Sequence, residues 1–181
     1  ALDSVGGWIS HLFQYVTGSL KDVTFEVFAL EDVKSADGES EDYYKKDELV
    51  ATITTDDTGI AKVSGLPLGK YYVKEKATVN GFVLDNEARE IDLTYRDQDT
   101  AEVTYSADWQ NNRQKAEVEV VKKEKDSDCV LEGAVFALCA KNDITGADGN
   151  VILEADTVIE ELATDKEGKL TFTADLPIGF E

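Results

Sequence analysis

Hydrophobic and polar positions alternate with a period of two residues along most of this chain. Five short segments show the alternation, at residues 23–28, 51–54, 71–74, 90–93 and 116–120. Such alternation, rich in β-branched and aromatic residues, is typical of strands that bury one face. Turn residues separate the segments, in Ala36-Asp37-Gly38, Asp57-Thr58-Gly59, Asn80-Gly81, Ala147-Asp148-Gly149 and Glu167-Gly168. No long helical pattern follows residue 20, so the sequence predicts an all-β sandwich.

The first 19 residues do not show this alternation clearly. Their apolar residues fall near helical spacing, at Val5, Trp8, Ile9, Leu12, Phe13 and Val16. The same stretch taken as a strand places Ile9, His11, Phe13 and Tyr15 on one face. Periodicity alone does not separate the two interpretations. We therefore expect residues 1–19 to form either a helix or a replacement first strand.

An internal repeat divides the rest of the chain. Three motifs recur in the same order at a nearly constant offset of about 110 residues, and they are anchored by the pairs Phe25 and Phe136, Gly59 and Gly168, and Leu66 and Leu176. The repeat predicts two copies of one domain, a complete one at 20–113 and the N-terminal part of a second one at 114–181. The copies join at a short polar hinge, residues 110–115, so we expect tandem β-sandwiches placed end to end.

Charge excludes several classes of partner. The 181 residues include 38 Asp+Glu and 18 Lys+Arg, which gives a formal net charge of −20. Nucleic acids and anionic membrane surfaces both need clustered basic residues, so neither is expected as a partner. No apolar run reaches the roughly 18–20 residues of a membrane span, so we expect no membrane insertion. We also expect a monomer in solution, because an acidic surface repels its own copies.

Histidine and cysteine are too scarce for the common catalytic and metal sites. His11 is the single histidine, and it lies far along the chain from Cys129 and Cys139, whose spacing matches no zinc site. Catalysis by Ser-His-Asp or Cys-His groups needs a histidine beside the nucleophile. We therefore expect no metal, no cofactor and no enzymatic turnover of an external substrate. His11 is interpreted as structural, and both cysteines are expected to be free thiols.

Several motifs resemble one domain family. Residues 118–123 followed by 131–138 resemble the opening strands of the CnaB-type (SpaA-like, prealbumin-like) domain of Gram-positive pilins and collagen-adhesin stalks. Residues 66–75 followed by 80–85 are similar to its E-box region, and Asn111 with the residues after it is similar to its closing segment. The resemblance covers residues 20–181. It implies a prealbumin-like, Ig-like β-sandwich in each copy.

The same resemblance implies a covalent cross-link. In this family a lysine of the first strand bonds to an asparagine of the last strand, and a buried carboxylic acid promotes the reaction. Matched residue by residue, Glu75 is the promoting acid and Asn111 the acceptor of the first copy, and Lys122 is the nucleophile of the second. In the first copy His11 stands at the lysine position, and residues 1–20 contain no lysine. The alternative interpretation makes Glu75 a strand-surface carboxylate, Asn111 a turn residue and Lys122 a solvated lysine.

These observations predict a structural function. We expect a stalk or pilin module of a cell-wall-anchored Gram-positive surface protein, located outside the cell and supporting adhesion. Its expected partners are the neighbouring domains of the same surface protein. A first alternative is an adhesin module that binds a host extracellular-matrix protein or a glycan directly. A second is a transthyretin-like carrier with an apolar pocket.

Overall fold

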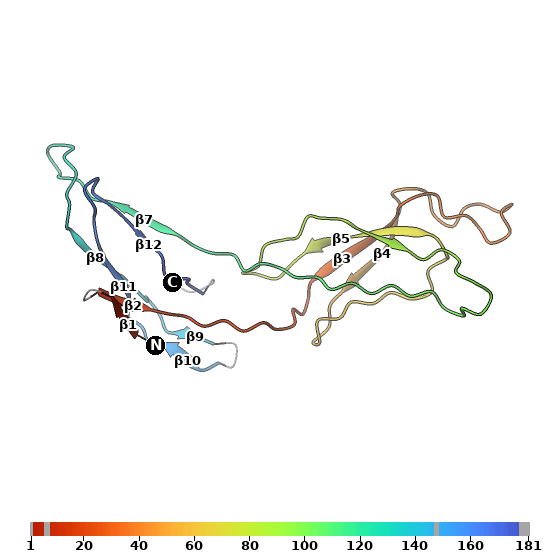
Figure 1. Ribbon diagram of the computed structural model, residues 1–181, viewed down its shortest axis with the longest axis horizontal. Helices are drawn as coiled ribbons and strands as arrows, with labels where there is room; N and C mark the ends of the chain where they lie inside the picture. The colour runs from red at the N-terminus through yellow and green to blue at the C-terminus, as the bar shows by residue number, and fades with distance from the viewer. Residues whose placement is uncertain (1, 6–7, 147–148, 178–181) are drawn as a thin grey trace. The chain divides into compact units, whose positions relative to one another are not determined.

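The computed structural model describes residues 2–5, 8–146 and 149–177, and every element assigned in them is a β-strand (Figure 1). The strands are β1 Leu2–Val5, β2 Trp8–His11, β3 Thr24–Ala29, β4 Leu49–Thr54, β5 Lys70–Ala77, β6 Arg89–Asp92, β7 Val118–Val121, β8 Val135–Cys139, β9 Ile144–Thr145, β10 Val151–Leu153, β11 Val158–Ala163 and β12 Lys169–Phe172. All their pairings are antiparallel. The predicted all-β fold class is confirmed, and the five alternating segments overlap β3, β4, β5, β6 and β7.

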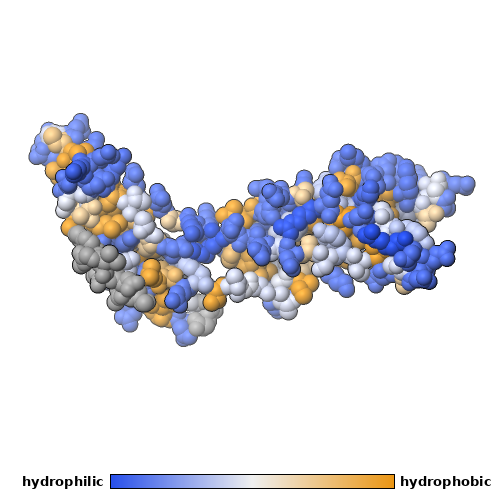
Figure 2. Space-filling model, in the orientation of Figure 1, coloured by the Kyte–Doolittle hydropathy of each residue, from blue (hydrophilic) through white to orange (hydrophobic). Residues whose placement is uncertain are grey.

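The chain divides into two compact units. One, here called the central unit, is Thr17–Arg113. The other, called the split unit, combines residues 1–16 with residues 114–181. On the face drawn in Figure 2, hydrophilic residues predominate and hydrophobic residues form separate patches between them.

The central unit is built on a four-stranded sheet of order β4-β3-β5-β6. Strand β3 lies inside this sheet, paired with β4 on one side and β5 on the other. Its alternation points Phe25, Val27 and Ala29 into the core, where they are 7%, 1% and 0% exposed. Tyr71 and Val73 of β5 enter the same core. The period-two pattern therefore selects the buried face directly.

The split unit contains three small sheets. The largest has the order β1-β2-β11-β8, and the other two pair β10 with β9 and β12 with β7. A separate core forms from Ala140, Ile144, Leu153 and Ile159, with Phe13 packed against it. Strand β8 is at the edge of its sheet, so its inward residues reach only intermediate burial.

The N-terminal segment is extended rather than helical in its described part. Strands β1 and β2 form an antiparallel hairpin, and Ser10 of β2 pairs with Glu160 of β11. The helical alternative for residues 1–19 is therefore wrong for 2–5 and 8–11. The segment is also not a first strand of the copy at 20–113, because residues 1–16 belong to the split unit. Periodicity gives no information on which sheet a strand joins.

Both units contain the same arrangement, here called the clasp, in which one threonine hydroxyl makes two hydrogen bonds to the backbone. In the central unit the Thr55 hydroxyl accepts from the amide of Val23 (2.9 Å) and donates to the carbonyl of Leu20 (2.7 Å). In the split unit the Thr164 hydroxyl accepts from the amide of Ala134 (3.0 Å) and donates to the carbonyl of Leu131 (2.6 Å). Both threonines are buried. The sequence repeat is therefore also a repeat of local structure, with Thr55 equivalent to Thr164.

Candidate functional site

Strand β5 carries Glu75 into the interior of the central unit. Tyr71, Val73 and Glu75 are successive inward positions of this strand, and Glu75 is only 5% exposed. In the ladder it lies opposite Phe25 of β3. A buried carboxylate needs hydrogen-bond donors to offset its lost hydration, so its position requires specific partners. The interpretation of Glu75 as a strand-surface carboxylate is wrong.

Those partners are the side chain of Asn111 and one backbone amide. The Nδ2 of Asn111 lies 2.7 Å from Oε1 and 2.8 Å from Oε2 of Glu75. It also lies 3.1 Å from the carbonyl oxygen of Val83. The amide of Asp85 donates to Oε2 at 2.6 Å. The two residues that the family resemblance pairs, 36 positions apart in the chain, are thus in direct contact.

Backbone contacts hold the last segment of the unit in place. The amide of Val83 donates to the carbonyl of Asn112 at 2.8 Å, and Phe82 forms an isolated bridge with Arg113. Residues 111–113 consequently run beside residues 82–83. Because Asp85 is two residues after Val83, the same contacts bring its amide to Glu75.

Aromatic and cationic groups stand next to the pair. Trp109 packs edge-on against Phe25, with ring centroids 5.0 Å apart. The guanidinium of Arg89 lies 3.8 Å from the centroid of the Trp109 ring and forms an ion pair with Asp85 at 3.5 Å. Phe25, which lies opposite Glu75 in the ladder, therefore packs against Trp109. Arg89 links Trp109 to Asp85. Sequence reasoning missed the contacts that Arg89 and Asp85 make. The tryptophan two residues before Asn111 is a usable signal of an aromatic contact near this site.

The arrangement supplies two of the three groups needed for amide exchange. A carboxyl group in contact with the nitrogen of a primary amide can pass a proton to that nitrogen as an attacking amine displaces it. In the described part of the chain the partners of the Glu75 carboxylate are Asn111 and the Asp85 amide, and no lysine is paired with it. The amine is therefore the missing third group.

Lys122 belongs to the split unit, directly after β7. Its amide donates to the carbonyl of Gly168 at 2.7 Å, and its carbonyl accepts from the amide of Leu131 at 3.1 Å. Its side chain is exposed, and in the part of the chain that the structure describes no acid or asparagine contacts its ammonium. The role of Lys122 as a nucleophile stays a prediction.

The remaining sequence candidates have structural surroundings. His11 lies edge-on to Phe13, with ring centroids 4.9 Å apart. Cys129 and Cys139 are both free and exposed. Among the described residues no group of His, Cys, Asp and Glu side chains is arranged to hold a metal ion, and no helix there is long and apolar enough to cross a membrane.

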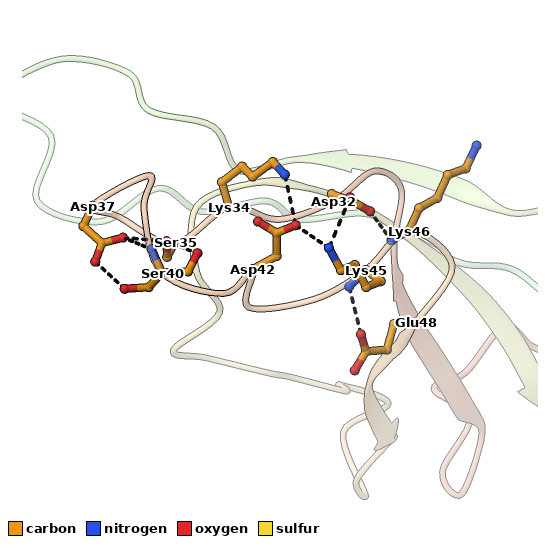
Figure 3. Close-up of polar contacts among 9 residues, drawn as sticks. All are labelled: Asp32, Lys34, Ser35, Asp37, Ser40, Asp42, Lys45, Lys46 and Glu48. Atoms are coloured by element: carbon orange, nitrogen blue, oxygen red, sulfur yellow. Dashed lines mark hydrogen bonds and ion pairs between the residues drawn. The ribbon is translucent and has the colours of Figure 1, made fainter.

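In the loop between β3 and β4, carboxylates form hydrogen bonds and ion pairs with other groups of the same loop (Figure 3). Asp42 is held by Lys45 at 2.7 Å and by Lys34 at 3.0 Å, and the hydrogen bond from Lys45 is the main cause of its lowered pKa. Asp37 accepts from the Ser40 and Ser35 hydroxyls and from two backbone amides, and these bonds hold its pKa well below the usual range. The Asp37 and Asp42 carboxylates therefore stabilise the conformation of this loop.

Comparison with known proteins places these features in a family. Residues 14–109, more than half of the chain, match the SpaA family model, described as a prealbumin-like fold domain. The solved structure titled "The Bacillus anthracis TIE protein" is similar, with a TM-score of 0.53 and 27% identity, over 86% of this chain and 23% of that one. This chain therefore corresponds to less than a quarter of that protein. Among curated proteins none matches. The chain belongs to the SpaA family of prealbumin-like fold domains.

Proposed function

We propose that this chain is a load-bearing structural module of a Gram-positive cell-wall-anchored surface protein, a stalk or pilin segment that supports adhesion. Its family is found in pilins and other surface proteins of Gram-positive bacteria. The observation that carries the proposal is the buried contact between Glu75 and Asn111. That contact fastens the end of the central unit to an interior strand.

The position of this contact suits a domain that is pulled at its ends. Tension applied through the chain reaches the central unit at its C-terminal end, Arg113, only two residues beyond Asn111. Three hydrogen bonds from the Asn111 amide and one to the Asn112 carbonyl must then break together before the segment leaves. Resistance to pulling is governed by the rate of unfolding, which such late-breaking contacts slow.

The finer proposal concerns an isopeptide bond. A lysine amine would attack Cγ of Asn111, so that a new C–N bond forms, the bond from Cγ to Nδ2 breaks, and ammonia leaves. Glu75 would act as the promoting acid, because it already touches the amide. In the parent protein Lys122 would react likewise with an acid and an asparagine of the second copy. The bond would resist both reduction and tension.

Localisation and partners follow from the same proposal. The module is placed outside the cell, attached to the cell wall through the rest of its parent protein, with the neighbouring domains as its partners. The function is mechanical, so the module acts on no external substrate.

Force spectroscopy tests the mechanical function. The full chain is pulled between reference domains as wild type, as Asn111→Ala and as Gln110→Ala, where Gln110 is an exposed neighbour outside the contact. We expect Asn111→Ala to lower the unfolding force of one unit and Gln110→Ala to leave it unchanged. Equal forces for all three variants, together with saturable binding of the chain to a matrix protein or glycan, would favour the direct adhesin. Intact mass reports any cross-link as the loss of one ammonia.

A further inference from the structure

Within the residues that the structure describes, one strand of the split unit has no counterpart in the central unit. In the split unit β7 pairs with β12 over four residues, from Val121 opposite Lys169 to Val118 opposite Phe172. Since Gly59 is equivalent to Gly168, the counterpart of β12 in the central unit is residues 60–63. Within the described part of the chain, residues 60–63 pair with no strand.

The described part of the central unit also lacks the backbone hydrogen bonds that hold this strand in the split unit. In the split unit the Gly168 carbonyl accepts from Lys122, and the Lys122 carbonyl accepts from Leu131. The equivalents of Gly168 and Leu131 are Gly59 and Leu20, and the described residues supply no strand between them. The clasp at Thr55 is nevertheless intact, so the backbone at Leu20 and Val23 is held as its counterpart is held in the split unit.

The chain's own candidate for this position is engaged elsewhere. Counted with the offset of 111 residues that relates Leu20 to Leu131, the counterpart of β7 is residues 7–10, of which 8–10 belong to β2, Trp8–His11. That strand lies in the split unit, between β1 and β11. It also contains no lysine.

Burial shows that the core is uncovered at this edge. Leu170 and Phe172 of β12 are each 6% exposed beneath the paired β7. Their counterparts Ala61 and Val63 pack against the central core but are only half-buried. Trp109 packs against the same core, and its Nε1 is buried without a hydrogen-bond acceptor. A backbone carbonyl of an added strand is the kind of group that satisfies such a donor.

Charge indicates what kind of strand fits. The Glu75 carboxylate is buried, and its partners, an amide side chain and a backbone N–H, are both neutral. Residues 17–113 contain 21 acidic and 11 basic residues, so the unit attracts cationic segments. In the split unit the equivalent position is filled by Val118-Glu119-Val120-Val121 with Lys122 directly after it. The complementary occupant is therefore an extended, β-branched segment that carries a lysine.

We propose that the central unit accepts a lysine-bearing β-strand from a separate polypeptide beside residues 60–63 and joins its lysine to Asn111. This rests on the isopeptide chemistry of the proposed function and adds to it the partner. The lysine attacks as a free amine and forms a C–N bond to Cγ of Asn111. The bond from Cγ to Nδ2 breaks, Glu75 relays a proton from the amine to the departing nitrogen, and ammonia leaves. The step changes no oxidation state.

The test uses the full chain and a synthetic peptide with the sequence of residues 116–125, which contains the strand that fills this position in the split unit. Intact-mass measurement after mixing should show a new species equal to chain plus peptide minus one ammonia. Peptide mapping should locate the new bond at Asn111. Hydrogen exchange at residues 60–63 should slow when the peptide is present.

Matched variants separate the steps. Asn111→Ala in the chain should abolish the adduct, and Gln110→Ala should preserve it. A peptide carrying K122R, K123R and K125R should still slow exchange at 60–63 but form no adduct, because the guanidinium is always protonated. Single lysine-to-arginine peptides identify the reacting lysine.

Several results would overturn the proposal. One is exchange at 60–63 that the peptide does not slow, another is slowed exchange without an adduct, and a third is an adduct that survives Asn111→Ala. A chain whose own mass already lacks one ammonia at Asn111 would also overturn it, while supporting the cross-link within the chain. An adduct at Asn111 combined with equal unfolding forces in the pulling experiment would instead contradict only the load-bearing function.

Discussion

Strands β3 and β8 are the same strand of the repeat, yet they are buried to different depths. Phe25, Val27 and Ala29 of β3 are all buried, whereas Phe136 and Leu138 of β8 are only half-buried. Both strands alternate in the same phase. The difference is in their neighbours, because β3 lies between β4 and β5 while β8 has β11 alone. Alternation thus decides which side chains point inward, and the neighbouring strands decide how deeply they are buried.

For the strand that opens each copy, the split unit is the more complete of the two. The split unit has β7 beside β12, and among the described residues the central unit shows no strand in the same position. Each unit therefore shows what the other lacks, and the equivalent residues of the two copies act as internal controls for one another.

The largest expected effect is on the two equivalent phenylalanines. Phe25→Ala removes a buried ring that also contacts Trp109, so we expect it to cost the central unit about 3–5 kcal/mol. Phe136→Ala should cost clearly less, because part of its ring is already hydrated. Denaturant unfolding, with hydrogen exchange to assign each transition to its unit, measures both. Equal losses would mean that burial depth does not separate the two copies.

The clasps should behave alike. Thr55→Val and Thr164→Val each remove one hydroxyl that makes two hydrogen bonds. The amide that loses its acceptor is buried in the central unit and partly buried in the split unit. We expect a loss of about 1–3 kcal/mol in the unit that carries the change. Thr52→Val, at an exposed position of β4, is the control. A loss in one unit only would show that the clasp supports just one of the copies.

Glycine substitutions should distinguish the copies again. Gly59 and Gly168 both have positive φ, so alanine at either position costs about 1–2 kcal/mol in backbone conformation. At Gly168 a Cβ atom would also stand 2.7 Å from the Lys122 carbonyl, which belongs to the backbone beside β12. At Gly59 it meets the small Ser19 side chain at 2.8 Å. We expect Gly168→Ala to be the more damaging and to speed hydrogen exchange in β7. Equal exchange in both variants would contradict this.

The smallest expected effect is on the stability at low pH. Asp42 has a lowered pKa, first through the hydrogen bond from Lys45 and then through that from Lys34. Its contribution to stability is therefore complete above the unfolded value of about 3.9 and is lost as pH falls through the lower folded value. NMR titration of the carboxyl carbons should show this, and Lys45→Gln should move the Asp42 midpoint upward. Asp37, whose pKa is lowered mainly by the Ser40 and Ser35 hydroxyls, should not move in that variant.

Much of the fold follows from the sequence because its signals are local. Alternation located the strands of the central unit, and paired turn residues such as Gly59 and Gly168 located the repeat. The contact of Glu75 with Asn111 was expected from the family resemblance, since nothing in their spacing brings them together. The pairing of Ser10 with Glu160 could not be expected, because a strand's hydrophobic pattern does not specify a partner about 150 residues away. The contact of Arg89 with Trp109 escaped for the same reason.

Placing both ends of the chain in the split unit has a consequence for the order of synthesis. Strand β2 is made about 150 residues before its partner β11, Val158–Ala163. The central unit lies between them and can fold as soon as Arg113 is available. A folded central unit then connects the two parts of the split unit in place of a flexible loop of about 100 residues, whose closure would cost entropy. Until β11 is made, the hairpin of β1 and β2 has an unpaired edge that is open to chaperones, proteases and other nascent strands.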